Sequence, residues 1–175
     1  MPDPQDIDRL FRDYHAGLVR YLARRLGDRD RAEDVAQETF VRAMRQERLT
    51  SERSWLYAVA TNLVRDEART DDRRRQRLAM LADEERAREL EAPETTAMER
   101  AQDAAFARRA LDQLAERDRN ALLMREEGLD YQEIAQALEL SPGSVGTTLA
   151  RARRRLAEAY ETLQAEREGR ENAVS

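Results

Sequence analysis

The sequence contains no cysteine and no lysine, and its only histidine is His15. Without cysteine there is no disulfide bond and no thiolate metal site, and a single histidine does not build an imidazole site alone. No phosphate-cradling glycine loop occurs, and no nucleophile lies beside a base. We therefore expect no metal, no cofactor, no small-molecule substrate and no enzymatic activity.

Signals for strands, turns and membrane spans are also scarce. Aromatic residues make up only 5% of the chain, and there are six glycines and four prolines. No apolar run approaches the ~20 residues of a membrane-spanning helix. The acidic N-terminus, residues 1–11, lacks the basic-then-apolar order of a signal peptide. We expect a cytoplasmic protein with no membrane insertion.

What the chain does have is charge, and its distribution matters more than its total. Net charge is −5 and 38% of residues are charged. Residues 81–104 hold three arginines and eight acids, whereas residues 141–160 hold four arginines and one acid. Arginine binds phosphate oxygens bidentately, although genomic composition alone explains the absence of lysine. These local basic clusters keep a nucleic-acid partner open.

Apolar residues recur at three- and four-residue steps, which predicts an all-α protein with two small helical domains. Residues 1–82 form the first domain, in which we expect four helices. Residues 83–103 are acidic, contain Pro93 and read as a linker. Residues 104–164 form the second domain, and residues 165–175 read as a flexible tail.

Local signals mark the helix ends of the first domain. Asp3 and Pro4 begin the first helix, Gly27 ends it, and Asp30 with Glu33 resembles a capping box for the second. The third helix follows Ser51, and its apolar positions are Trp55, Leu56, Val59, Ala60 and Leu63. Its other side is predicted to expose Tyr57, Thr61, Asn62, Arg65 and Arg69. Aromatic rings beside arginines suit single-stranded nucleic acid, although a buried Trp55 with solvated arginines remains the alternative.

The second domain carries the strongest local signal, a helix-turn-helix. Asp130 and Glu133 form a capping pair for a short amphipathic helix, and Ser141-Pro142 starts a longer one directly after it. The buried stripe of the longer helix is Val145, Leu149, Ala152 and Leu156. Its exposed face is predicted to carry Ser144, Thr147, Thr148, Arg151, Arg154 and Arg155, which suit base edges and phosphates. A generic helical hairpin with a solvated basic face is the alternative.

Three stretches together resemble the extracytoplasmic-function (ECF) sigma factors, which are subunits of bacterial RNA polymerase. The stretches are AEDVAQETFVRA at 32–43, RSWLYAVATNLVRDEAR at 53–69, and the block from Leu111 to Leu156. The first two stretches resemble part of the family's region 2 and the third resembles its region 4, in the family's order. Without this resemblance, the polar helix at 31–45 would read as a plain solvated face.

The resemblance implies roles for individual residues. The docking face for the β′ clamp helices of core polymerase would be Asp34, Gln37, Glu38, Phe40 and Val41. The minus-ten element would be bound by Arg48, Arg53, Tyr57, Thr61, Asn62, Arg65 and Arg69, with residues 47–53 forming a pocket for a flipped base. The minus-thirty-five element would be read by Ser144, Thr147, Thr148, Arg151, Arg154 and Arg155. Further expected partners are the polymerase β flap, promoter DNA and an anti-sigma factor.

Three features depart from the family pattern. The loop at 47–53 is shorter than in many members, so the specificity of the flipped-base pocket does not carry over. Gly146 and Thr148 stand where many relatives place arginine or lysine, which shifts minus-thirty-five anchoring towards Arg151. No further domain is expected after Leu163. The rival functions are a self-contained helix-turn-helix regulator, which leaves residues 31–77 unexplained, and a helical enzyme or scaffold, for which no site is present.

Overall fold

The computed structural model describes residues 4–79 and 95–174. These residues form seven helices, and no strand occurs among them. The helices are α1 (Pro4–Leu26), α2 (Arg29–Met44), α3 (Glu52–Ala79), α4 (Thr95–Asp112), α5 (Glu116–Glu126), α6 (Tyr131–Leu138) and α7 (Pro142–Val174). The predicted all-α class is confirmed.

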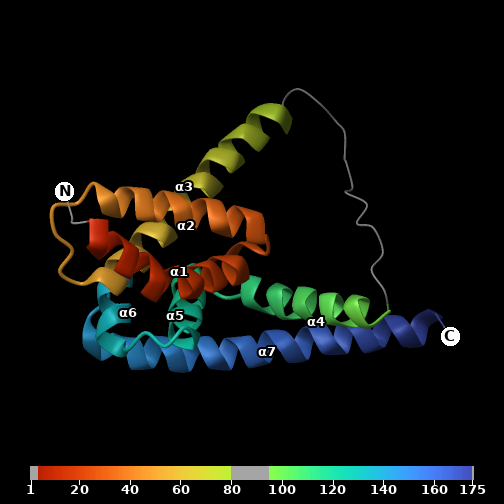
Figure 1. The fold of residues 1–175 in the computed structure, drawn as a ribbon. Coiled ribbons are helices and arrows are strands. Elements are labelled where there is room, and N and C mark those ends of the chain that lie inside the picture. The colour runs from red at the N-terminus through yellow and green to blue at the C-terminus, as the bar shows by residue number, and fades with distance from the viewer. Residues whose placement is uncertain (1–3, 80–94, 175) are drawn as a thin grey trace.

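The first three helices make up the N-terminal unit, residues 4–79. Helix α1 packs along α2, and α3 lies against both. The bidentate pair between Arg9 and Glu52, with nitrogen–oxygen distances of 2.6 and 3.0 Å, ties α1 to the start of α3. The N-terminal unit has three helices over the described residues instead of the expected four, because α3 runs without a break to Ala79. The second half of α3 projects away from the body of the molecule (Figure 1).

Helices α4 to α7 make up the C-terminal unit, residues 95–174. Helix α4 runs antiparallel to α7, while α5 and α6 pack on the first half of α7 (Figure 1). Ala110, Ala159 and Leu163 hold α4 against α7, with Phe106 meeting Tyr160 edge-on at 4.8 Å between ring centroids. Residues 165–174, expected as a flexible tail, continue α7 instead. Of the expected linker, residues 95–103 belong to α4, and residues 83–94 lie outside the described residues.

Local chain geometry at the helix ends agrees in part with the sequence signals. Gly27 and Gly128 follow α1 and α5 with φ values of +69° and +83°, which glycine adopts without strain. Asp130 and Glu133 form the predicted capping box. The capping prediction for α2 is wrong by two residues, because Asp28 rather than Asp30 accepts the backbone N–H of Arg31.

The two units pack against each other. One continuous apolar cluster runs from Leu10, Leu18 and Leu56 of the N-terminal unit to Leu123, Ile134 and Leu149 of the C-terminal unit. The main contacts between the units are those of α3 with α6 and of α1 with α5. None of the helices over residues 4–79 and 95–174 combines the length and apolar character that crossing a bilayer needs.

Candidate polymerase and nucleic-acid interfaces

The face proposed for polymerase docking lies on α2. Asp34 and Gln37 are exposed, and Glu38 accepts a hydrogen bond of 2.8 Å from Arg42 one turn further on. Phe40, by contrast, is 5% exposed and contacts Phe11, with ring centroids 5.2 Å apart. Val41 is half-buried. The polar members of the face are accessible in this structure, whereas Phe40 supports the face from within the core.

His15 lies near this face of α2 and contacts neighbouring side chains of the protein. Its ring stacks on Phe11 at 4.1 Å between centroids, and its Nε2 lies 3.2 Å from a carboxylate oxygen of Glu33.

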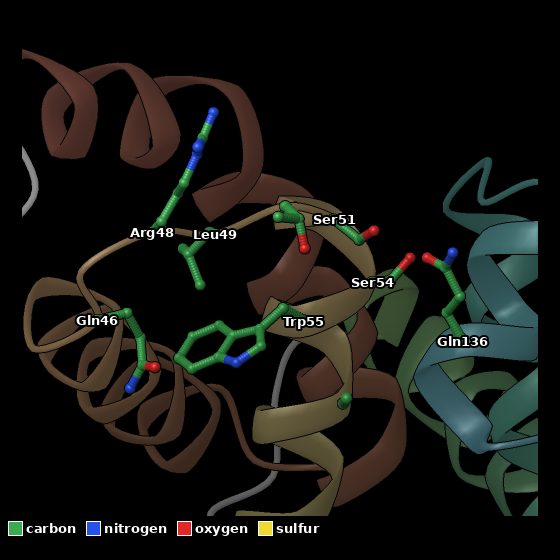
Figure 2. A pocket seen from close by; sticks show the side chains of 9 residues that line it. Gln46, Arg48, Leu49, Ser51, Ser54, Trp55 and Gln136 are labelled. Carbon is green, nitrogen blue, oxygen red and sulfur yellow. The ribbon is translucent and has the colours of Figure 1, made fainter.

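A shallow cavity of about 320 Å³ opens where α2 leads into α3. Its lining residues are Gln46, Arg48, Leu49, Thr50, Ser51, Ser54, Trp55, Ala58 and Gln136. Figure 2 shows Leu49 and the indole of Trp55 facing one another across the cavity, with the guanidinium of Arg48 pointing outward. Gln46 lies at the edge of the indole. A flat apolar wall with amide and hydroxyl groups around it suits a planar base, which stacks on the wall and hydrogen-bonds at its edge.

Two of the residues expected on the strand-binding face of α3 are instead in the core. Tyr57 is 1% exposed and Thr61 is 5% exposed. Thr61 donates to the carbonyl of Tyr57 at 2.7 Å, which leaves its oxygen to accept from the hydroxyl of Tyr21, also at 2.7 Å. Burial raises the pKa of Tyr21 to about 12 and also raises the pKa of Tyr57, so both phenols stay protonated. The predicted outward orientation is wrong because α1 and α6 cover α3 from two sides.

The arginines of α3 have different partners and different exposure along the helix. Arg53 lies near the start of α3 and donates to the carbonyls of Glu127 and Gly128 in the C-terminal unit. Arg65, near the middle, pairs with Glu116 of α5 at 3.2 Å and donates to the side chain of exposed Asn62 at 3.3 Å. Arg69 is exposed on the projecting half of the helix. The structure thus places most of the predicted polar strand contacts at or beside the boundary between the two units.

The helix-turn-helix consists of α6, a short connection and α7. Glu139 ends α6 in the left-handed region with φ of +54°, and the N–H of Leu140 reaches back to the carbonyl of Ala135 at 2.8 Å. Val145 and Leu149 are fully buried and face α5 and α6, so the second helix packs as its periodicity predicts. Ser144 donates its hydroxyl to the carbonyl of Ser141 at the start of α7.

The exposed face of α7 is narrower than predicted. Thr147, Arg154 and Arg155 are exposed, and Ser144 is half-buried. Thr148 is only 4% exposed, so its predicted outward orientation is wrong. Position 148 lies three residues after Val145 and four before Ala152, and therefore belongs to the buried stripe.

Arg151 is engaged within the protein. Its guanidinium makes a bidentate pair with Asp118 of α5, with Nε at 2.8 Å and Nη2 at 2.5 Å from the two carboxylate oxygens. The hydrogen bonds from Arg151 hold the pKa of Asp118 below its usual value, and the carboxylate in turn raises the pKa of Arg151. The sequence assigns Arg151 a large share of the minus-thirty-five anchoring, and in this structure that guanidinium is paired with Asp118 while its side chain stays 41% exposed.

Asp118 is a functional candidate that the sequence reading missed. Its side chain is 2% exposed, although it lies in a helix rich in charged residues. A signal was available, because Asp118 stands three and four residues before Ala121 and Leu122 and so shares their buried stripe. A carboxylate on such a stripe needs a cation within hydrogen-bond distance, and the partly exposed Arg151 provides it.

Two helical units, one of which presents a helix-turn-helix with exposed threonine and arginine, are typical of a DNA-binding protein. Comparison with known families refines this class. Residues 10–74 match the model "Sigma-70 region 2" and residues 107–156 match "Sigma-70, region 4". The region 2 match covers nearly all of residues 31–77, the segment that a self-contained helix-turn-helix regulator would leave unexplained.

Individual relatives agree with these matches. The chain is 30% identical to RNA polymerase sigma-H factor of Pseudomonas aeruginosa, over 92% of this chain and 89% of that protein. It is 29% identical to ECF RNA polymerase sigma factor SigX of Bacillus subtilis, over 90% of this chain and 84% of that protein. The fold is similar to that of the sigma factor RpoE in the co-crystal structure with the anti-sigma factor NepR from Bartonella quintana, with a TM-score of 0.66 and 20% identity over 90% and 98% of the two chains.

The chain belongs to the sigma-70 family, in its ECF group. It is a non-enzymatic subunit that binds core RNA polymerase and directs it to promoter DNA.

Proposed function

We propose that three surfaces divide the work of promoter recognition within this sigma factor. The exposed part of α2, with Asp34, Gln37 and Glu38, docks on the β′ clamp helices of core polymerase. The cavity beside Trp55 and the arginines of α3 capture melted minus-ten bases. The exposed face of α7 reads the minus-thirty-five element. The exposure of Asp34 and Gln37 on a helix whose other side is buried is the observation that supports the docking assignment most directly.

The chemistry of each surface suits its proposed ligand. Arg48, Trp55 and Gln46 offer a phosphate contact, a stacking wall and an edge hydrogen bond at one cavity. Thr147 and Arg154 stand on one exposed side of α7, where a short side chain reaches base edges and a long one reaches phosphates. Extruding bases costs a few kcal/mol each, so their capture supplies part of the free energy of promoter melting.

We also propose how this chain is controlled and where in the cell it acts. A solved sigma factor of related fold is bound to an anti-sigma factor, which supports control of this chain by such a partner. The chain would act in the cytoplasm, where core polymerase and DNA are found. The polymerase β flap is the proposed contact of the C-terminal unit.

The docking assignment is tested by replacing both Asp34 and Gln37 with alanine. We expect core-polymerase affinity in a fluorescence titration to fall at least tenfold, the factor that corresponds to ~1.4 kcal/mol. The stability of the free chain should change by less than about 0.5 kcal/mol because both residues are exposed.

The matched control is the double variant Glu161→Ala with Gln164→Ala, which removes one acid and one amide at the same three-residue spacing on exposed α7. The control should bind core polymerase as the unmodified chain does. Equal affinity of the two double variants would remove the α2 face from the docking role.

A further inference from the structure

We infer that the junction of α1, α4 and α5 binds a tetrahedral oxyanion of the size of inorganic phosphate. The binding groups are the guanidinium groups of Arg25, Arg108 and Arg119 and the side-chain amide of Asn120. None of these four residues is among those proposed to contact polymerase or DNA, so the inference goes beyond the proposed function. Its basis is a surplus of positive charge and of hydrogen-bond donors in a part of the molecule that is largely shielded from solvent.

Arg25, in the last turn of α1, is the common neighbour of the other three residues. Its Nε donates to Oδ1 of Asn120 at 3.0 Å, and its backbone carbonyl accepts from Nη2 of Arg108 at 3.4 Å. Burial lowers the pKa of Arg119, and the nearby positive charges of Arg25 and Arg108 lower it further. The side chains of Arg25 and Arg119 are only 14% and 13% exposed, and Asn120 is fully buried. Solvent therefore does little to screen these charges from one another.

The carboxylates at the junction do not balance its arginines. The carboxylates of Asp112 and Glu116 are shared by four arginines, namely Arg25, Arg65, Arg108 and Arg119. The nitrogen–oxygen distances in these pairs run from 2.8 to 3.8 Å. Two positive charges are thus left without a carboxylate of their own, and charge that is shielded from water is costly unless it is paired. A phosphate group carries about −1.5 to −2 at neutral pH, which matches this excess.

The same residues have more hydrogen-bond donors than acceptors. Among the described residues, three buried side-chain nitrogens have no hydrogen-bond partner: Nη1 of Arg108, Nε of Arg119 and Nδ2 of Asn120. Turning the Asn120 amide over does not help, because its NH₂ group would then face the Nε–H of Arg25. A guanidinium group has donors only, so these residues do not satisfy one another. A water molecule would accept their hydrogen bonds but would not balance the charge, whereas phosphate oxygens do both.

Two features of the backbone favour an anion at the junction. Gly27, directly after α1, has a φ of +69°, and a Cβ at this position would overlap the guanidinium of Arg108. Glycine therefore allows that guanidinium to lie against the end of α1. Helix α5 begins after Ala115 without a side-chain cap, and Glu116 is its first residue. The positive end of α5 therefore lies at the junction and adds to the charge of the arginines.

Thermal unfolding of the full chain tests the site, with sodium phosphate compared against sodium chloride at equal ionic strength. Phosphate also stabilises folded proteins generally, because it is excluded from their surface, so the rise is compared between variants. At ten times the dissociation constant of the parent chain, the site should contribute a rise of about 3–6 °C in melting temperature. Arg119→Gln should weaken phosphate binding at least tenfold, which reduces this contribution to about 1–2 °C.

The matched control is Arg117→Gln, which removes the same charge from an exposed position two residues away on α5. Arg117 forms no ion pair with any described residue, so this variant should keep the rise and the affinity of the parent chain. Arg108→Gln, compared with Arg109→Gln at the exposed neighbouring position, provides a second pair if Arg119→Gln does not fold. Far-UV circular dichroism checks that each variant remains helical.

Isothermal titration with inorganic phosphate measures the binding directly, and we expect saturable heat with one phosphate per chain. Heat that does not saturate would mean an adventitious ion only and would overturn the inference. An equal rise in melting temperature for the parent chain, Arg119→Gln and Arg108→Gln would also overturn it, because water would then satisfy the donors. Titration with ATP tests the source of the phosphate group. Tighter binding of ATP than of the free ion, lost in Arg119→Gln, would overturn the assignment to inorganic phosphate.

Discussion

At the scale of single residues, the surface that α7 offers to DNA depends on which of its side chains are exposed and which are engaged within the protein. Thr147 is exposed, Thr148 is buried and Arg151 is paired with Asp118. Thr147 therefore becomes the leading candidate for base readout, whereas Arg151 holds α7 against α5. This division differs from the sequence expectation, in which all three residues shared one DNA-facing role.

Thr147→Ala and Arg151→Ala separate these two roles. Thr147→Ala should leave urea stability within about 0.5 kcal/mol and weaken initiation at promoters with one particular base pair by ~1–3 kcal/mol. Arg151→Ala should lower the urea midpoint, because it leaves the buried carboxylate of Asp118 without its hydrogen-bonded partner. Urea unfolding and transcription on a series of minus-thirty-five variants measure the two effects. Base-specific loss in Arg151→Ala without loss of stability would reverse the assignment.

Single residues also show which structural features can be predicted from the sequence and which cannot. Asp130 with Glu133, and Gly27, were predicted correctly because a helix cap depends on neighbours within a few positions. Tyr57 was assigned to the wrong side because it is covered by other elements, which helical periodicity does not reveal. The burial of Thr148, by contrast, follows from its spacing to Val145 and Ala152 on the buried stripe. The partners Asp118 and Arg151 lie 33 positions apart, so their pairing depends on how α5 packs on α7.

At the scale of elements, an ion pair between Asp118 of α5 and Arg151 links α5 to α7, and the Asp118 carboxylate titrates with pH. Because Arg151 depresses the pKa of folded Asp118, this pair stabilises the fold above the ordinary aspartate pKa of about 3.9. Its contribution is lost as pH falls below that value and through the lower pKa of the folded state. The packing of α7 on α5 should therefore weaken at acidic pH.

Asp118→Asn tests this link. The difference in unfolding free energy between the parent chain and the variant should be largest near about pH 7 and should shrink as pH falls below about 4. Urea midpoints measured across this range give the difference directly. A gap that stays constant down to about pH 2, or widens on acidification, would show that the Asp118 carboxylate does not provide the stabilisation.

At the scale of the whole molecule, the two units pack against each other. Helices α5 and α6 share an apolar cluster and several ion pairs with α1 and α3. The sequence predicted two domains, at residues 1–82 and 104–164, but the packing of one on the other depends on contacts such as that of Arg20 with Glu127, 107 positions apart.

The central claim is that this chain gives core RNA polymerase its choice of promoter. Its most direct test is transcription by purified core polymerase, with and without the chain, on a library of genomic fragments whose transcript 5′ ends are sequenced. We expect new start sites that share two upstream sequence elements, and we expect Thr147→Ala to redistribute initiation among variants of the upstream element. The account would be contradicted if adding the chain gave the same start sites as core polymerase alone.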